Sequence, residues 1–286
     1  MRDIESMDDR CGRKTAMIVP KHYEDLRVLH ENTMPSRAYF IPASYQMDDL
    51  VEHREHSDRF QLLNGNWKFR FYSSIHDLRE HFYEADFRPD GYNTISAPGV
   101  LQNYGYDRHQ YTNIRYPFPI NPPYVPVDNP CGAYLYDFSY QKDVSAPRAF
   151  LTFEGVDSCF YVWLNGTYVG YSQVTHSGSE FEVTDCIREG ENTLAVLVLK
   201  WCDGSYQEDQ DKFRMTGIIR DVYLLKRPIN PVMDYFVNTK IERFRCESQA
   251  GILRNYSCMM GKIAWRQRKS LRHPTTLHFL RVGFSG

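Results

Sequence analysis

Four carboxylates gather in one short loop and are the side chains of this sequence best placed to do chemistry. The loop also carries aromatic and thioether side chains; its members are Asp203, Tyr206, Glu208, Asp209, Asp211, Phe213 and Met215. Carboxylates accept hydrogen bonds from sugar hydroxyls, and aromatic rings pack on the C–H faces of a sugar. The pattern indicates a sugar-contacting surface. A solvated acidic loop is the alternative, and composition alone favours it.

Two expected strands position this loop. Residues Thr193 to Trp201 are apolar at both odd and even positions, which predicts a strand buried on both faces. A second strand is expected from Asp221 to Lys226, behind a turn at Gly217. Loops held between rigid strands are common carriers of binding residues.

The spacing across this loop carries a resemblance to a known family. Residues 201–222 read WCDGSYQEDQDKFRMTGIIRDV, and this stretch resembles the sugar-binding domain of glycoside hydrolase family 2 β-galactosidases. The LNG-x-W-x-F-x-F pattern at residues 63–71 resembles the entry strand of that domain, and residues 30–44 (HENTMPSRAYFIPAS) resemble the arm that precedes it. The resemblance implies a jelly-roll domain.

The resemblance also implies two substrate-binding residues. Asn113, in the YTN-x-x-YP segment at 111–117, would hydrogen-bond a galactosyl hydroxyl, because an amide can donate and accept at once. Asp203 corresponds to a residue that lies at the sugar's 6-hydroxyl and a bound sodium ion. That role needs partners from other domains, and alone Asp203 is expected to be an exposed carboxylate. The family often has Trp near position 101, where this chain has Leu101, so no stacking role is expected there.

No catalytic residue is expected in this chain. Retaining glycoside hydrolysis needs two carboxyl groups about 5 Å apart. In the family both lie on a TIM barrel, with the acid/base Glu in an Asn-Glu pair. No Asn-Glu pair occurs here, and no βαβα pattern of a barrel is present. The chain is therefore expected to be a fragment, truncated before the catalytic barrel and inactive alone.

No cofactor is expected for this chain either. The resemblance implies sodium and magnesium for the full-length family enzyme. The ten histidines show no HxxxH or His/Glu spacing that predicts a metal site.

Many short strands and few helices predict an all-β fold. Alternation of Trp67, Phe69 and Phe71 indicates a strand with one buried face, and Asn165-Gly166 is a strong hairpin signal because both positions favour positive φ. A short helix is expected over residues 75–87. These patterns indicate a β-sandwich, and the resemblance narrows it to a jelly roll, so the expected fold class is a jelly-roll β-sandwich with an extended N-terminal arm and an irregular C-terminal tail.

The expected organisation has four parts. Residues 1–58 form a largely extended arm, and 59–228 form the jelly-roll sugar-binding domain. Residues 229–241 form a linker and the first strand of a truncated immunoglobulin-like domain. Residues 242–286 hold nine Lys or Arg against two Glu and lack sustained periodicity, so an aberrant, disordered basic tail is expected.

Net charge and cysteine content indicate which partners and which cellular location to expect. The net charge of −2 gives no reason to expect nucleic acid or membrane as a partner. The seven cysteines show no CxxC spacing, and the charged first residues do not resemble a signal peptide, so a cytoplasmic location is expected.

Two functions remain open from the sequence. The first is a non-catalytic galactoside-binding domain of a β-galactosidase, with β-galactosides such as lactose and the remaining enzyme domains as partners. The alternative is a stand-alone, lectin-like carbohydrate-binding module, since the same fold serves both.

Overall fold

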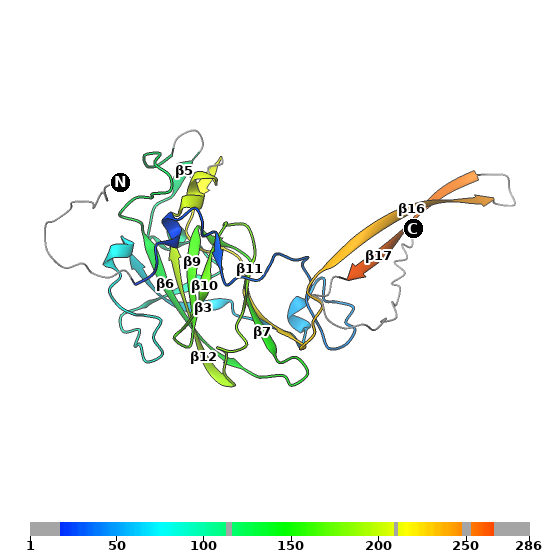
Figure 1. Cartoon of the computed structure of the whole chain (residues 1–286), viewed down its shortest axis with the longest axis horizontal. Coiled ribbons are helices and arrows are strands. Elements are labelled where there is room, and N and C mark those ends of the chain that lie inside the picture. The colour runs from blue at the N-terminus through cyan, green and yellow to red at the C-terminus, as the bar shows by residue number, and fades with distance from the viewer. Residues whose placement is uncertain (1–17, 113–115, 209–210, 248–252, 266–286) are drawn as a thin grey trace, which may run out of the picture.

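Two antiparallel sheets pack face to face in the main body of the protein (Figure 1). The computed structural model describes residues 18–112, 116–208, 211–247 and 253–265. The larger sheet has seven strands in the order β1 (His30–Glu31), β10 (Thr167–Gln173), β9 (Cys159–Leu164), β12 (Gly190–Leu199), β6 (Cys131–Tyr140), β3 (Gly65–Tyr72) and β4 (Asn93–Ala97). The smaller has four, in the order β11 (Ser179–Glu182), β7 (Arg148–Phe153), β15 (Val222–Arg227) and β2 (Phe60–Leu62). The predicted all-β sandwich is confirmed.

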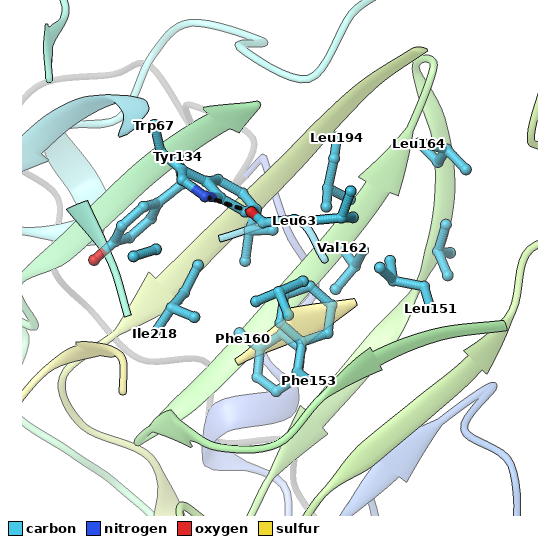
Figure 2. Close-up of a cluster of buried hydrophobic side chains, with 14 of the residues drawn as sticks. Leu63, Trp67, Tyr134, Leu151, Phe153, Phe160, Val162, Leu164, Leu194 and Ile218 are labelled. Carbon is cyan, nitrogen blue, oxygen red and sulfur yellow. Dashed lines mark hydrogen bonds between the residues drawn. The ribbon is translucent and has the colours of Figure 1, made fainter. Parts of the chain in front are cut away.

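The central strand β12 is buried on both faces, as its apolar sequence predicts. Leu194, Val196 and Val198 join the core between the two sheets. Figure 2 shows part of this core, where Phe160 of the large sheet lies beside Phe153 of the small one, with their ring centroids 4.8 Å apart. The alternate residues of β12, including Leu197, face a second core on the outer side of the large sheet.

The second core explains how the large sheet avoids exposing an apolar outer face. It is covered by Val19 and Tyr23 of the arm, by Phe82 and by Val125. Burying apolar surface is the main favourable contribution to folding, so these coverings stabilise the sheet that carries the acidic loop.

Shorter elements complete the fold. The 3-10 helices are η1 (His22–Glu24), η2 (Arg54–His56), η3 (Ile75–Asp77), η4 (Leu101–Tyr104) and η5 (Asp203–Tyr206). Strands outside the two main sheets pair as β5 (Gln110–Thr112) with β13 (Lys212–Arg214), and β8 (Val156–Asp157) with β14 (Gly217–Ile218). Within the described residues, no helix is long and apolar enough to cross a membrane.

The hairpin predicted at Asn165-Gly166 is confirmed. The two residues have φ of 54° and 84° and join β9 to β10. The Asn165 side chain also accepts a hydrogen bond from the backbone N–H of Thr193 and donates to Asn192, which fixes the turn against β12. A local sequence signal and a tertiary contact therefore specify the same turn.

The arm crosses from one sheet to the other along one side of the sandwich. In β1, Glu31 is paired with Tyr171 of β10. Two residues further on, Thr33 bridges to Phe181 in β11, and the Met34 N–H donates to the Glu180 carbonyl at 2.7 Å. The arm is thus largely extended, and its backbone joins the edges of both sheets.

Two segments differ from the sequence-based expectation. Residues 75–87 contain only the three-residue helix η3, followed by turns whose side chains Leu78 and Phe82 insert into the outer core. Regular structure also continues past residue 241, because β16 (Tyr235–Glu247) pairs with β17 (Leu253–Trp265) in a two-stranded sheet that projects from the sandwich in Figure 1. Main-chain hydrogen bonds form such a ladder without an alternating apolar pattern.

Candidate functional site

The acidic loop begins at a fixed point, the end of β12. Asn129 is fully buried, and its side chain hydrogen-bonds both the carbonyl and the N–H of Trp201. Its amide donates to the Trp201 carbonyl at 2.8 Å, and its side-chain oxygen accepts from the Trp201 N–H at 2.9 Å. Ser158 donates to the next carbonyl back, that of Lys200, at 2.7 Å. The chain therefore enters η5 in one defined direction.

Asp203 is the first residue of η5 and is only 4% exposed. The expectation of an exposed carboxylate is therefore wrong. One carboxylate oxygen accepts the Gly204 N–H at 2.9 Å, and the Gln173 side chain also hydrogen-bonds the group. A side chain at position 204 would lie 3.2 Å from Gln173, so glycine allows this close packing.

Burial shifts the ionisation of Asp203. Removal from water raises the pKa of its carboxyl group, and the negative charge of Asp25 in the arm adds to the rise. The hydrogen bonds from Gln173 and Gly204 act in the opposite direction, but the net pKa is raised. The arm thus influences the electrostatics of the site.

Glu208 and Arg214 hold the middle of the loop. The Glu208 carboxylate accepts both the backbone N–H and the hydroxyl of Thr175, each at 2.9 Å. The buried Arg214 guanidinium donates to the Ser205 carbonyl at 2.6 Å and lies 3.6 Å from Glu208. These contacts fasten η5 to the segment that follows β10.

Tyr206 fastens the proline-rich loop to η5. Its hydroxyl donates to the Tyr124 carbonyl at 2.6 Å and accepts the Asn121 N–H at 3.2 Å. The Tyr116 hydroxyl donates in turn to the Tyr206 carbonyl at 2.5 Å. The described residues 116–130 contain no strand, as their prolines predict.

Strands β5 and β13 bring the two segments singled out from the sequence together. Tyr111 is paired directly with Phe213, and both rings are 55% exposed. The Tyr111 hydroxyl donates to the carboxylate of Asp211, which is exposed. Asn113 and Asp209 lie outside the described residues. The strand that leads to Asn113 nevertheless runs beside the acidic loop.

Several residues of this site escaped the sequence analysis. Three of them lie far from the loop in sequence. Asn129 is in the proline-rich run, Gln173 is at the end of a strand, and Asp25 is in the arm. Nothing in their local sequence marks them, because their roles depend on the strand order of the sheet. The fixed backbone at Trp201 and the buried Asp203 are consequences of tertiary structure.

Two cavities lie beside the arm, and Asp203 lines neither of them. One, of about 320 Å³, lies between the arm and the small sheet and includes Arg37, Glu180 and Tyr223. The other, of about 390 Å³, includes Phe40 and Tyr235.

The donor set around Asp203 fits a complete metal site poorly. One of its oxygens is occupied by the Gly204 N–H, and the side chain of Gln173 is already its partner. Hard cations take about six or more oxygen ligands. Further ligands would have to come from other protein segments.

A family comparison covers most of the sandwich. The family model described as "Glycosyl hydrolases family 2, sugar binding domain" matches residues 60–228. A β-galactosidase of Actinobacillus pleuropneumoniae is 49% identical over 226 residues, covering 79% of this chain and 22% of that protein. A β-galactosidase of Staphylococcus xylosus is 43% identical over 228 residues, with the same two coverages. The chain spans about a fifth of the length of these relatives.

A solved structure supports the fold. Bacteroides uniformis β-glucuronidase 2, covalently bound to cyclophellitol-6-carboxylate aziridine, aligns with a TM-score of 0.50 and 15% sequence identity. The alignment covers 74% of this chain and 28% of that one. At this level of identity the likeness concerns architecture alone.

Proposed function

Because the chain belongs to glycosyl hydrolases family 2 and contains the sugar binding domain of a β-glycosidase, we propose that it supplies one wall of a galactoside-binding pocket. The observation that carries the proposal is the pairing of β5 with β13. This pairing presents the exposed rings of Tyr111 and Phe213 beside the exposed carboxylate of Asp211. Aromatic faces beside carboxylates suit a pyranose ring. The β-galactosidase relatives support galactosides as the ligands.

The proposed role is non-catalytic. Three carboxylates of the loop already serve as hydrogen-bond acceptors: Asp203 for Gly204, Glu208 for Thr175 and Asp211 for Tyr111. A retaining mechanism needs one carboxyl group free to attack carbon and another to exchange a proton. We assign that chemistry to the part of the related enzymes that this chain does not cover, which is about four-fifths of their length.

The remaining assignments belong to the same proposal. Asn113 and Asp203 are the proposed sugar-contacting residues, with Asp203 reaching the ligand only when other domains complete the pocket. β-Galactosides such as lactose and those other domains are the proposed partners. Sodium and magnesium are assigned to the complete enzyme. A cytoplasmic location is proposed, and the four cysteines without a disulfide among the described residues support it.

Mixing the chain with the part of a related β-galactosidase that it does not cover tests the proposal. We expect recovery of hydrolysis of a chromogenic galactoside in the mixture, and none from either component alone. Hydrolysis by the purified chain alone would overturn the non-catalytic role.

Calorimetric titration of the chain with galactose and lactose separates the two binding functions. A severed pocket wall should bind either sugar too weakly to detect. A stand-alone lectin-like module should bind with a dissociation constant of about 1 mM or tighter, equivalent to roughly 4 kcal/mol. Millimolar binding by the chain alone would therefore favour the lectin.

A further inference from the structure

An exposed group of metal-binding side chains lies on the arm, on and around η2. His53, Glu55 and His56 each place one potential ligand atom within 4.8 Å of the others. The pattern H-R-E-H folds these side chains together because η2 is a tight 3-10 turn, with the His56 N–H donating to the His53 carbonyl at 3.1 Å. We propose that this group, named here the arm triad, is a binding site for a divalent transition metal such as Zn²⁺.

The donor types select the class of metal. Two imidazoles and one carboxylate suit Zn²⁺, Co²⁺ or Ni²⁺, whereas Mg²⁺ and Ca²⁺ prefer oxygen ligands alone. The Nδ1 atom of His53 already lies 3.3 Å from a Glu55 oxygen. Ligands of a tetrahedral zinc ion are separated by roughly 3.3 Å, as bond lengths of about 2.0–2.1 Å require. Small side-chain rotations would therefore bring the arm triad to this geometry, with water as the fourth ligand.

Asp49 provides the orienting contact that zinc-bound histidines usually have. Its carboxylate lies 2.7 Å from Nδ1 of His56. A hydrogen bond at Nδ1 leaves Nε2 of the same ring available for a metal and fixes the ring orientation. The backbone carbonyl of Asp49 also accepts the His53 N–H at 2.8 Å, so Asp49 and η2 form one folded unit.

Arg54 anchors this unit to the sandwich. Its guanidinium donates to Glu154 at 2.6 Å and to Asp221, and it lies 5.3 Å from the ring centroid of Tyr223. The central residue of the motif thus points into the body while its neighbours stay exposed. A rigidly seated turn loses little conformational entropy when it binds an ion, and preorganisation of this kind favours affinity.

Titration of the full chain with Co²⁺ and Zn²⁺ tests this site. Bound Co²⁺ should give visible d–d absorption without the near-ultraviolet charge-transfer band that thiolate ligands produce. The double variant His53→Gln/His56→Gln should lose one metal equivalent per chain. Asp49→Asn should retain that equivalent with an affinity weakened by roughly 10–100-fold.

His81→Gln/Glu84→Gln is the matched control. His81 and Glu84 form an exposed pair 3.6 Å apart that contains a single histidine, so the control should bind metal as the parent does. Urea unfolding in the presence of a chelator should be the same for the parent, for His53→Gln/His56→Gln and for the control, since those side chains are exposed. Equal metal stoichiometry and affinity in the parent and in His53→Gln/His56→Gln would overturn the site, whatever other metal binding the chain has.

Discussion

Tyr111 and Phe213 are cross-strand neighbours, with their ring centroids 5.7 Å apart in an edge-to-face arrangement. A residue from the segment before the proline-rich loop and one from the acidic loop therefore meet, although they lie about a hundred positions apart in sequence. The two-stranded sheet that they form sets the exposed edge of the candidate site.

A double-mutant cycle should detect this pair. We expect Tyr111→Ala and Phe213→Ala each to destabilise the chain modestly, with a coupling free energy of about 0.2–1 kcal/mol, because aromatic cross-strand pairs interact by this amount. Urea unfolding of the parent, both single variants and the double variant measures the coupling. Strictly additive effects would mean that the rings do not stabilise one another.

Asn129→Ala should be much more damaging than its polar character suggests. The substitution leaves the N–H and carbonyl of Trp201 without partners in a buried setting. We expect a loss of about 2–6 kcal/mol in the free energy of unfolding, since each of the two groups costs about 1–3 kcal/mol. Asn103→Ala, at an exposed position, is the control and should change little. A similar small loss for both variants would rule out the clamp on Trp201.

Glu180→Gln should break the connection between the arm and the small sheet. Glu180 is paired with Arg37 at 2.6 Å and with the buried Arg227 at 2.7 Å. Removing its charge leaves two guanidinium groups without a counter-ion, which should cost about 3–5 kcal/mol. Glu182→Gln, in the more exposed pair with Arg148, should cost at most about 1 kcal/mol. Chemical denaturation of both variants measures the difference.

The cost of Glu180→Gln should also depend on pH. Burial alone would raise the pKa of Glu180, but the hydrogen bond from Arg37 and the charge of Arg227 outweigh it and lower the pKa below the ordinary 4.5. A lowered pKa contributes stability above the unfolded-state value and loses it as the pH falls toward the folded-state value. The difference between parent and variant should therefore shrink below about pH 4.5. A difference independent of pH would exclude an ionised Glu180.

Asp203→Asn should show the opposite dependence. The pKa of Asp203 is raised above the ordinary 3.8, chiefly by burial. The ionised group is thus less favourable in the folded chain, and its unfavourable effect develops as the pH rises above about 3.8. Relative to the parent, the variant should gain stability between pH 4 and pH 7, as measured by urea unfolding across that range. A constant difference would mean that the carboxylate is as well solvated folded as unfolded.

Gly170→Ala should release the arm. A Cβ at this position would lie 2.4 Å from the Glu31 carbonyl and 2.8 Å from the ring of Phe181. Real Cβ atoms do not approach other atoms this closely, so β1 would have to move from β10. Limited proteolysis should cut the arm faster in this variant. Gly178→Ala, whose Cβ would have only one neighbour, at 3.8 Å, should be cut like the parent; equal cutting of Gly170→Ala would contradict the close approach.

The sequence predicts those parts of the fold that depend on local pattern. Alternation gives the buried faces of Trp67 and Phe69, the Asn165-Gly166 pair gives its turn, and a run of apolar residues gives β12. These features involve neighbouring residues and simple periodicity, so they are readable without the tertiary structure.

The contacts of the candidate site are harder to predict from the sequence, because they join residues that lie far apart in the chain. Asn129 reaches Trp201 across 72 positions. Asp203 is covered by Gln173 and is influenced by Asp25, which belongs to the arm. No local sequence pattern predicts these contacts, so the burial of Asp203 does not follow from the sequence.

The strand pairing at the edge of the small sheet has a consequence for biosynthesis. Phe60 of β2 pairs with Leu225 of β15, and the Ala38 N–H of the arm donates to Asp234. A ribosome that adds about 5–20 residues per second needs roughly 10–30 s to pass from β2 to β15. Throughout that interval the nascent chain carries β2 and the arm residue Ala38 without their final partners, so this edge of the sandwich closes late in translation.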